Sequence, residues 1–229
     1  MKRKSAFALL VVGFVAACAT SESPAPAKPD PDGLLSVRSG RLDQLYLRPG
    51  SDIAGYRKVV LDPVAVELSS DWMKQQHGNN YRIQPTYPRY KDAGQVTRET
   101  AESVSASLAR AFRAAGFEIV EAPGPGVMRV TAKVNELYIN APDIVSPGYA
   151  RNITRDAGEA TLSLEARDAV DGKMLARLRH HAIARETPRA NLASDPANTL
   201  WMDTLFSRWA QSCATELSAP KRGQLSLKD

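Results

Sequence analysis

Three segments of the chain alternate apolar and polar residues, which is the pattern of a β-strand with one buried and one wet face. They cover residues 128–134, 159–167 and 176–185. A shorter apolar segment at 56–61 ends before a proline that cannot donate to a strand ladder, and residues 117–120 form another short apolar run. Because the two last long segments are separated by a short loop, the pattern predicts a mainly antiparallel sheet.

The loop between these last two strands determines how they pair. A two-residue Asp171-Gly172 turn would set apolar positions opposite polar ones. A three-residue loop, 170–172, sets apolar residues opposite apolar ones and polar residues opposite polar ones. A slip of one residue would move every side chain of the strand to the other face of the sheet. We therefore predict the three-residue loop, with Gly172 in the left-handed conformation and a bulge beside it. The expected partners are Ala166 and Ala176, Leu164 and Leu178, Ala160 and Ala182, and Glu165 and Arg177.

Two further segments repeat apolar residues at three- and four-residue steps, as the buried stripe of a helix does. The first is predicted to begin at Thr97 as N-cap and to end at Gly116. The second begins at Asp195 and Pro196, which suit the cap and the first helical position, and ends before Pro220. We expect its apolar face to be a core face rather than a partner-binding surface: Trp201, Met202, Leu205, Phe206, Trp209, Cys213 and Leu217.

These elements predict a single α+β domain over residues 34–220, a mainly antiparallel sheet with two helices packed on one face. Residues 69–95 show no clear periodicity and carry aromatic residues and His77 among Gly, Asn and Pro. A connection this long inside a compact domain is often functional. With the acidic end of the first strand, it supplies the predicted binding surface: Asp62, Trp72, Tyr81, Tyr87 and Tyr90.

The first eighteen residues form a targeting segment. A basic start at residues 2–4 precedes an apolar run at 6–17, and that run is shorter than the about 20 residues a membrane-spanning helix needs. Small residues stand directly before Cys18, so the segment resembles the lipobox of bacterial lipoproteins. The resemblance implies cleavage before Cys18 and its fatty acylation (palmitate), and hence a lipid anchor. The alternative is an ordinary secretory signal peptide that happens to end near a cysteine.

The same resemblance bears on location, because residue 19 is alanine and not the aspartate that holds enteric lipoproteins in the inner membrane. It implies the periplasmic face of the outer membrane in a Gram-negative bacterium. Residues 18–33 contain four prolines and almost nothing apolar larger than alanine. We expect them to form an extended tether that lifts the domain about 45 Å from the membrane. Residues 221–229 read as a polar tail.

Charge and motifs exclude several classes of function. The 229-residue chain carries a net charge of +5, and removing residues 1–17 takes away three cations, which leaves about +2. We therefore expect no nucleic-acid partner. The sequence has no Gly-x-Ser-x-Gly, His-Glu-x-x-His, phosphate-loop or Cys-x-x-Cys motif. His180 and His181 are neighbours on a predicted strand and point to opposite faces, so we predict no metal site and no cofactor.

One stretch near the N-terminus carries a family resemblance. The residues are Tyr46–Gly50, Asp52, Tyr56, Lys58-Val59 and Leu61–Val64. They resemble the opening of a family of Gram-negative lipoproteins that are grouped under a domain of unknown function. The resemblance extends over residues 40–218. It implies an envelope location and brings no activity with it.

The leading hypothesis is a non-catalytic accessory or binding module of the cell envelope, recruited to an envelope protein complex or to a cell-wall or lipid component. The anchor, the tether and the missing catalytic motifs favour it. The alternative is a periplasmic hydrolase that acts on a cell-wall, lipid or small ester substrate and uses Asp62 with polar residues of 69–95. A third hypothesis is a purely structural or stress-related lipoprotein.

Overall fold

The computed structural model describes residues 29–79, 92–140, 153–154, 156–184, 191–192 and 195–219. Within these ranges, no helix combines the length and the apolar character needed to cross a membrane. The predictions for Cys18, Tyr81, Tyr87, Tyr90 and residues 221–229 lie outside the described residues, as does the side chain of His77.

The described residues form an eight-stranded sheet with the strand order β1-β2-β9-β8-β6-β3-β5, and β4 lies beside β6 next to β3. The contacts of β3 with β5 and β6, and of β4 with β6, are parallel; the others are antiparallel. The strands are β1 (Leu35–Ser36), β2 (Gln44–Leu47), β3 (Lys58–Leu61), β4 (Ala65–Leu68), β5 (Glu118–Ile119), β6 (Val127–Ile139), β8 (Gly158–Asp168) and β9 (Met174–Ile183). A separate two-stranded ladder pairs β7 (Ile153–Thr154) with β10 (Asn191–Leu192), and a short 3-10 turn, η1, covers Ile53–Gly55.

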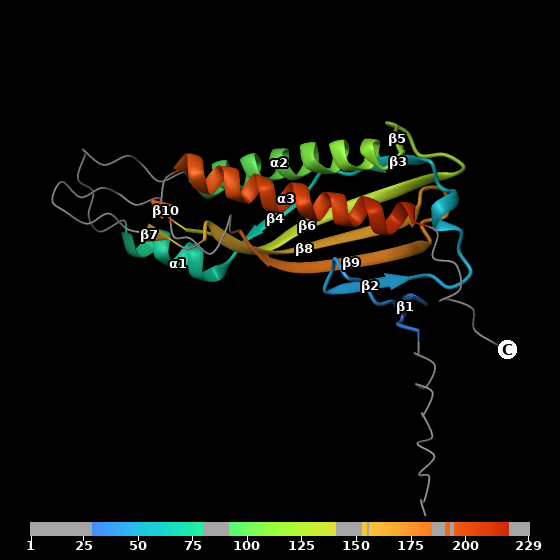
Figure 1. Cartoon of the computed structure of the whole chain (residues 1–229), viewed down its shortest axis with the longest axis horizontal. Helices are drawn as coiled ribbons and strands as arrows, with labels where there is room; N and C mark the ends of the chain where they lie inside the picture. Colours follow the sequence, from blue (N-terminus) through green and yellow to red (C-terminus); the bar gives the residue numbers. More distant parts are fainter. Residues whose placement is uncertain are drawn as a thin grey trace, which may run out of the picture.

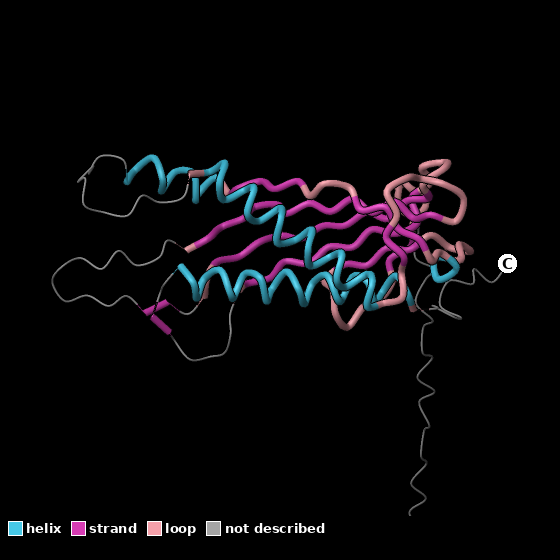
Figure 2. The backbone as a smooth tube through the Cα atoms, turned by 90° about the horizontal axis from the view of Figure 1, so that it is seen from above, coloured by secondary structure: helices cyan, strands magenta, loops and turns pink. Residues whose placement is uncertain are grey.

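Two long helices, α2 (Ala93–Ala114) and α3 (Asp195–Ser218), lie side by side over one face of the sheet (Figures 1 and 2). The alternating apolar residues of the central strands point at these helices and form the core, in which the largest buried side chains are Trp209, Phe112 and Phe206. Truncating a core residue such as Leu164 to alanine would cost about 2–5 kcal/mol. The prediction of an α+β fold with a mainly antiparallel sheet is therefore confirmed.

The predicted register of the β8–β9 hairpin is also confirmed. Ala166 pairs with Ala176, Leu164 with Leu178, Ala160 with Ala182, and Glu165 with Arg177. The pairing is irregular next to Ala166, and Gly172 has a φ of 73°, as the three-residue loop requires.

The helices differ from the sequence prediction in two places. Helix α2 begins before Thr97, because the Asp92 side chain caps it by accepting a hydrogen bond from the Gln95 N–H at 2.8 Å. Residues 70–79, which lack an apolar stripe, nevertheless form a third helix, α1 (Ser70–Asn79). Ser69 caps α1 by accepting from the Trp72 N–H at 3.1 Å. The predicted end of α2 is confirmed, since Gly116 has a φ of 90°.

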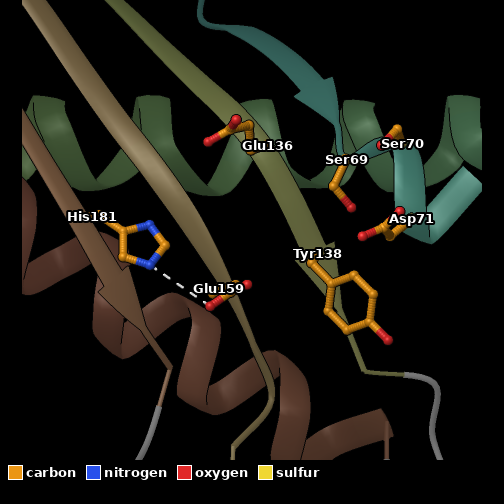
Figure 3. Close-up of a pocket in the computed structure, with 7 residues that line it drawn as sticks. All are labelled: Ser69, Ser70, Asp71, Glu136, Tyr138, Glu159 and His181. Carbon is orange, nitrogen blue, oxygen red and sulfur yellow. Dashed lines mark ion pairs between the residues drawn. The ribbon is translucent and has the colours of Figure 1, made fainter.

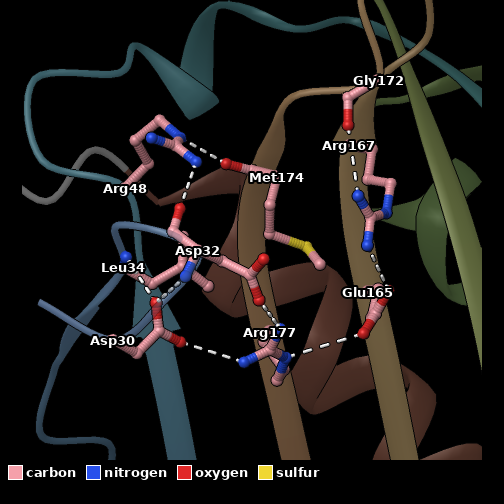
Figure 4. A network of polar contacts seen from close by, with 9 residues as sticks. All are labelled: Asp30, Asp32, Leu34, Arg48, Glu165, Arg167, Gly172, Met174 and Arg177. Carbon is pink, nitrogen blue, oxygen red and sulfur yellow. Dashed lines mark hydrogen bonds and ion pairs between the residues drawn. The ribbon is translucent and has the colours of Figure 1, made fainter.

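The segment before β1 is held to the sheet by charged groups (Figure 4). Arg177 on β9 makes ion pairs with Asp30 at 3.0 Å and with Asp32, and its Nε lies 3.6 Å from Glu165. Asp30 also accepts a hydrogen bond from the Leu34 N–H at 2.8 Å. The contacts of the folded body thus reach Asp30, inside the stretch predicted as tether.

Candidate functional site

The face of the sheet opposite α2 and α3 carries the polar residues of the alternating strands. Arg129 and Thr131 of β6 are exposed there, as are Arg179 and His181 of β9, whereas the residues that alternate with them are buried or half-buried under the helices. We call this the open face. A surface of charged and hydroxyl side chains on rigid strands can position polar groups for binding.

Asp62, the first residue of the predicted binding surface, lies at the end of β3 on the open face. The single Nε–H of Arg129 is shared between the two carboxylate oxygens of Asp62, each 2.9 Å from Nε, and Oδ2 also accepts from the Thr131 hydroxyl at 2.6 Å. The hydrogen bond from Arg129 is the main cause that holds the pKa of Asp62 below its ordinary value. An ionised, occupied carboxylate is a poor general acid and a weaker base, so the geometry does not favour the hydrolase hypothesis at this residue.

Trp72, the second described residue of that surface, lies on α1 and is 5% exposed. It belongs to the hydrophobic core rather than to an exposed aromatic face. The binding surface as predicted therefore keeps only Asp62 as an accessible described residue. The structure instead brings other polar residues together near the start of α1.

These residues line a pocket of about 540 Å³ on the open face, next to the start of α1 (Figure 3). The pocket is formed by residues of four elements or their ends. They are Ser69, Ser70 and Asp71 at the start of α1, Glu136 and Tyr138 on β6, Glu159 on β8 and His181 on β9.

A β-bulge places Glu136 in this pocket. Between Asn135 and Tyr138, β6 has one residue more than the facing part of β8, and it is also irregular against β4. The extra residue changes the alternation, so that Glu136 is exposed on the open face while Leu137 is fully buried. Glu136 has a φ of 53°, a left-handed conformation that costs a residue other than glycine about 1–2 kcal/mol. Strain of this kind is typical of functional positions.

Glu136 is the first member of a row of polar contacts. The Thr161 hydroxyl donates to Glu136 Oε2 at 3.2 Å and lies 3.3 Å from His181 Nδ1, and His181 Nε2 lies 3.6 Å from Glu159 Oε2. A carboxylate can only accept, so the single hydrogen of Thr161 is used on Glu136. The hydroxyl oxygen must then accept from His181, which requires a hydrogen on Nδ1. The hydrogen bond to Thr161 thereby orients the imidazole at the pocket surface, and His181 Nε2 attracts the Glu159 carboxylate when the ring carries a second hydrogen.

The order hydroxyl, imidazole, carboxylate is also the order of a nucleophilic triad. Here, however, Thr161 is only 3% exposed and its hydrogen is directed at Glu136. Its hydroxyl is not presented to a substrate, whereas Glu159 and His181 have side-chain exposures of 49% and 54%. The arrangement is suited to binding a ligand by hydrogen bonds. Among the residues whose positions are described, no group of three His, Cys, Asp or Glu could hold a metal ion.

The two adjacent histidines point to opposite faces, as predicted. His180 lies on the helix side, half-buried, with Nδ1 3.3 Å from Asp43 Oδ1, and His181 lies on the open face. The pocket as a whole was not predicted from the sequence. One signal was available: the alternation of β6 changes phase after Val134, because the next apolar residue is Leu137 and not residue 136.

A protein-family model matches most of the chain. The family described as "Protein of unknown function (DUF3313)" matches residues 32–211. The chain belongs to this family. The prediction that it is a member of a family with a domain of unknown function is therefore confirmed. The match spans α2, α3 as far as residue 211, and every lining residue of the pocket. No match was found among curated proteins.

Several solved structures are similar to the chain at 12% sequence identity. The PelC dodecamer from Paraburkholderia phytofirmans has a TM-score of 0.37, and the match covers 73% of this chain and 96% of that chain. A minor lipoprotein from Acinetobacter baumannii has a TM-score of 0.32, with 71% and 93% covered. A DUF4136 family protein from Bacteroides thetaiotaomicron has a TM-score of 0.36, with 82% and 98% covered. At these scores the similarity carries no argument about function.

Proposed function

We propose that this protein is a lipid-anchored, non-catalytic binding module of the cell envelope, held by Cys18 at the periplasmic face of the outer membrane. The lipobox pattern before Cys18 and the proline-rich stretch after it support the anchor. The observation that carries the binding role is the polar pocket on the open face, where Glu136, Glu159 and His181 are accessible on rigid strands. The binding partner belongs to an envelope assembly or to the cell wall.

The position of the pocket relative to the N-terminal segment suits this role. That segment is held at Arg177, and His181 stands four positions further along β9 on the same face. At about 3.3 Å per residue, the two sites are separated by about 13 Å along the strand. The pocket is therefore separate from the place where the N-terminal segment is held at Arg177. A partner can bind at the pocket while that segment stays in place.

The anchor is tested by fractionation. The wild-type chain is expected in the outer-membrane fraction with an acylated N-terminal cysteine by mass spectrometry, and a Cys18→Ser variant is expected to lose both. Equal fractionation of the two proteins would contradict the anchor.

Binding is tested by photo-crosslinking in intact envelopes. A photoreactive amino acid at Ile183, exposed on the open face two residues after His181, is compared with one at Arg208, exposed on α3. We expect an adduct from position 183 that disappears when Glu136→Gln and Glu159→Gln are added, and none from position 208. Adducts of equal yield at both positions, or an adduct from 183 that survives the pocket substitutions, would refute a role for the pocket.

A further inference from the structure

The chemistry of the pocket lining selects among the ligands that an envelope protein can meet. Carboxylates only accept hydrogen bonds, and the lining contains three of them, from Asp71, Glu136 and Glu159. The Ser69 oxygen already accepts from the Trp72 N–H, and its hydroxyl hydrogen donates to no described residue. The pocket therefore offers many acceptors and a few hydroxyl donors, which complements a ligand rich in hydroxyl groups.

The charge of the described lining disfavours acidic ligands. Among the described residues, no lysine or arginine lines the pocket, and Lys74, three residues after Asp71, is paired with it at 3.2 Å. Of the lining residues only His181 can carry a positive charge, and it faces Glu159. Phosphate or carboxylate groups would meet like charge without a compensating cation in this lining, which costs binding free energy.

The shape favours part of a polymer rather than an enclosed small molecule. A volume of about 540 Å³ lies within the range of ligand pockets, but Glu159 and His181 remain about half exposed at its border. A chain can therefore continue beyond the pocket across the open face. Tyr138 adds an aromatic ring to the lining, between the start of α1 and Glu159 (Figure 3). An aromatic ring beside hydroxyl acceptors suits the apolar face and polar rim of a sugar ring.

We propose that the pocket binds a saccharide segment without acidic groups, as part of an envelope glycan. Glu136 and Glu159 accept hydrogen bonds from its hydroxyl groups, and Tyr138 packs against a sugar ring. This inference rests on the proposed function and adds the class of ligand.

The test is calorimetric titration of the full chain in a detergent that has no sugar headgroup. The probes are trimers of N-acetylglucosamine, glucosamine and galacturonic acid, which are neutral, cationic and anionic, and spermidine, a polyamine without hydroxyls. We expect the first two trimers to bind and the galacturonate trimer not to bind. The inference would be overturned if the galacturonate trimer bound equally well, or if one of the other two trimers failed to bind. Spermidine binding as tightly as the glucosamine trimer would show an acidic patch and would overturn it too.

Variants tie the binding to the pocket. Glu136→Gln with Glu159→Gln removes two charged acceptors and is expected to weaken trimer binding at least about tenfold. The matched control, Glu118→Gln with Glu121→Gln, removes the same charge at the β5 end of the sheet (Figure 1) and is expected to leave binding unchanged. Glu159→Gln alone, at an exposed residue, gives a second measurement that does not depend on the strained bulge. Equal effects of pocket and control variants would refute the proposal.

Failure of this inference is distinguishable from failure of the proposed function. If no saccharide binds but the crosslink from position 183 still depends on Glu136 and Glu159, the ligand class is wrong and the binding module stands. If that crosslink is also missing, both are wrong.

Discussion

The end of the β6–β8 ladder should tolerate no side chain at Gly158. A Cβ there would lie 2.0 Å from the Tyr138 carbonyl oxygen and 2.9 Å from Ile139 Cα, and Gly158 has a φ of 133°. Since ordinary contacts begin at 3.4 Å, the two strands would have to separate by about 1.4 Å. The atoms in the way belong to the backbone and cannot move by rotation about a side-chain bond. The Gly158→Ala variant must therefore distort this end of the β6–β8 ladder or break its hydrogen bonds.

The control is Gly172→Ala in the β8–β9 loop. Gly172 also has a positive φ, 73°, but outside Gly172 and its two neighbours in the chain no described atom lies within 4 Å of its added Cβ. This variant therefore bears only the conformational cost, about 1 kcal/mol. Gly158→Ala adds overpacking of about 1–3 kcal/mol, which gives about 3 kcal/mol in total.

Urea unfolding followed by circular dichroism measures the difference. With a slope of about 2 kcal/mol per molar, the midpoint should fall by about 1.5 M for Gly158→Ala and by about 0.5 M for Gly172→Ala. Gly158→Ala should also weaken ligand binding, because Tyr138 and Glu159 flank the distorted point. If Gly158→Ala loses no more stability than Gly172→Ala, the close approach of the two strands is not a constraint and the reasoning is refuted.

Three further variants or probes test other contacts. The Tyr56 hydroxyl donates to Asp168 at 2.7 Å; burial and this bond raise the pKa of Tyr56 to about 12, and the bond lowers the pKa of Asp168 below its ordinary 3.8. Tyr56→Phe should therefore lower the melting temperature at pH 7, and the difference from wild type should shrink below pH 4 as Asp168 is protonated; a constant difference would contradict the linkage. Burial raises the pKa of the Cys213 thiol far above its usual range, so a thiol reagent should label it only after unfolding, and rapid labelling of the native protein would be the contrary result. Arg177→Met removes the ion pairs that hold Asp30, so proteases should cut near residues 29–34 sooner than in wild type at a stability loss of about 1 kcal/mol, and an unchanged cleavage pattern would count against this role.

The sequence predicted the long strands and their pairing because side-chain alternation and loop length are local properties. In β8 and β9, apolar residues could face each other in only one register, and the structure has that register. Helix boundaries were less predictable. Thr97 has a side chain suited to an N-cap, but Asp92, five residues earlier, caps the helix. Thr97 lies within the helix, where its Oγ1 donates to the Ala93 carbonyl at 3.0 Å.

The pocket was missed because its residues come from distant parts of the chain. Ser69, Glu136, Glu159 and His181 share no motif, and only strand pairing brings them together. The bulge that exposes Glu136 depends on pairing with β4 and β8, although the change of alternation after Val134 marks its place. The sequence predicts a surface position for Trp72 because it lies in the long, aromatic-containing connection 69–95, whereas it is buried in the core.

The most direct test of the account is nuclear magnetic resonance titration of the ¹⁵N-labelled full chain with the N-acetylglucosamine trimer. Because the pocket is assembled from four separate stretches, binding there should shift the backbone amide signals of residues 69–71, 136–138, 159–161 and 181 together. Signals from the exposed side of α2 and α3 should stay in place. Shifts centred on those helices, or an unchanged spectrum at saturating trimer, would contradict the assignment of this pocket as the glycan-binding site.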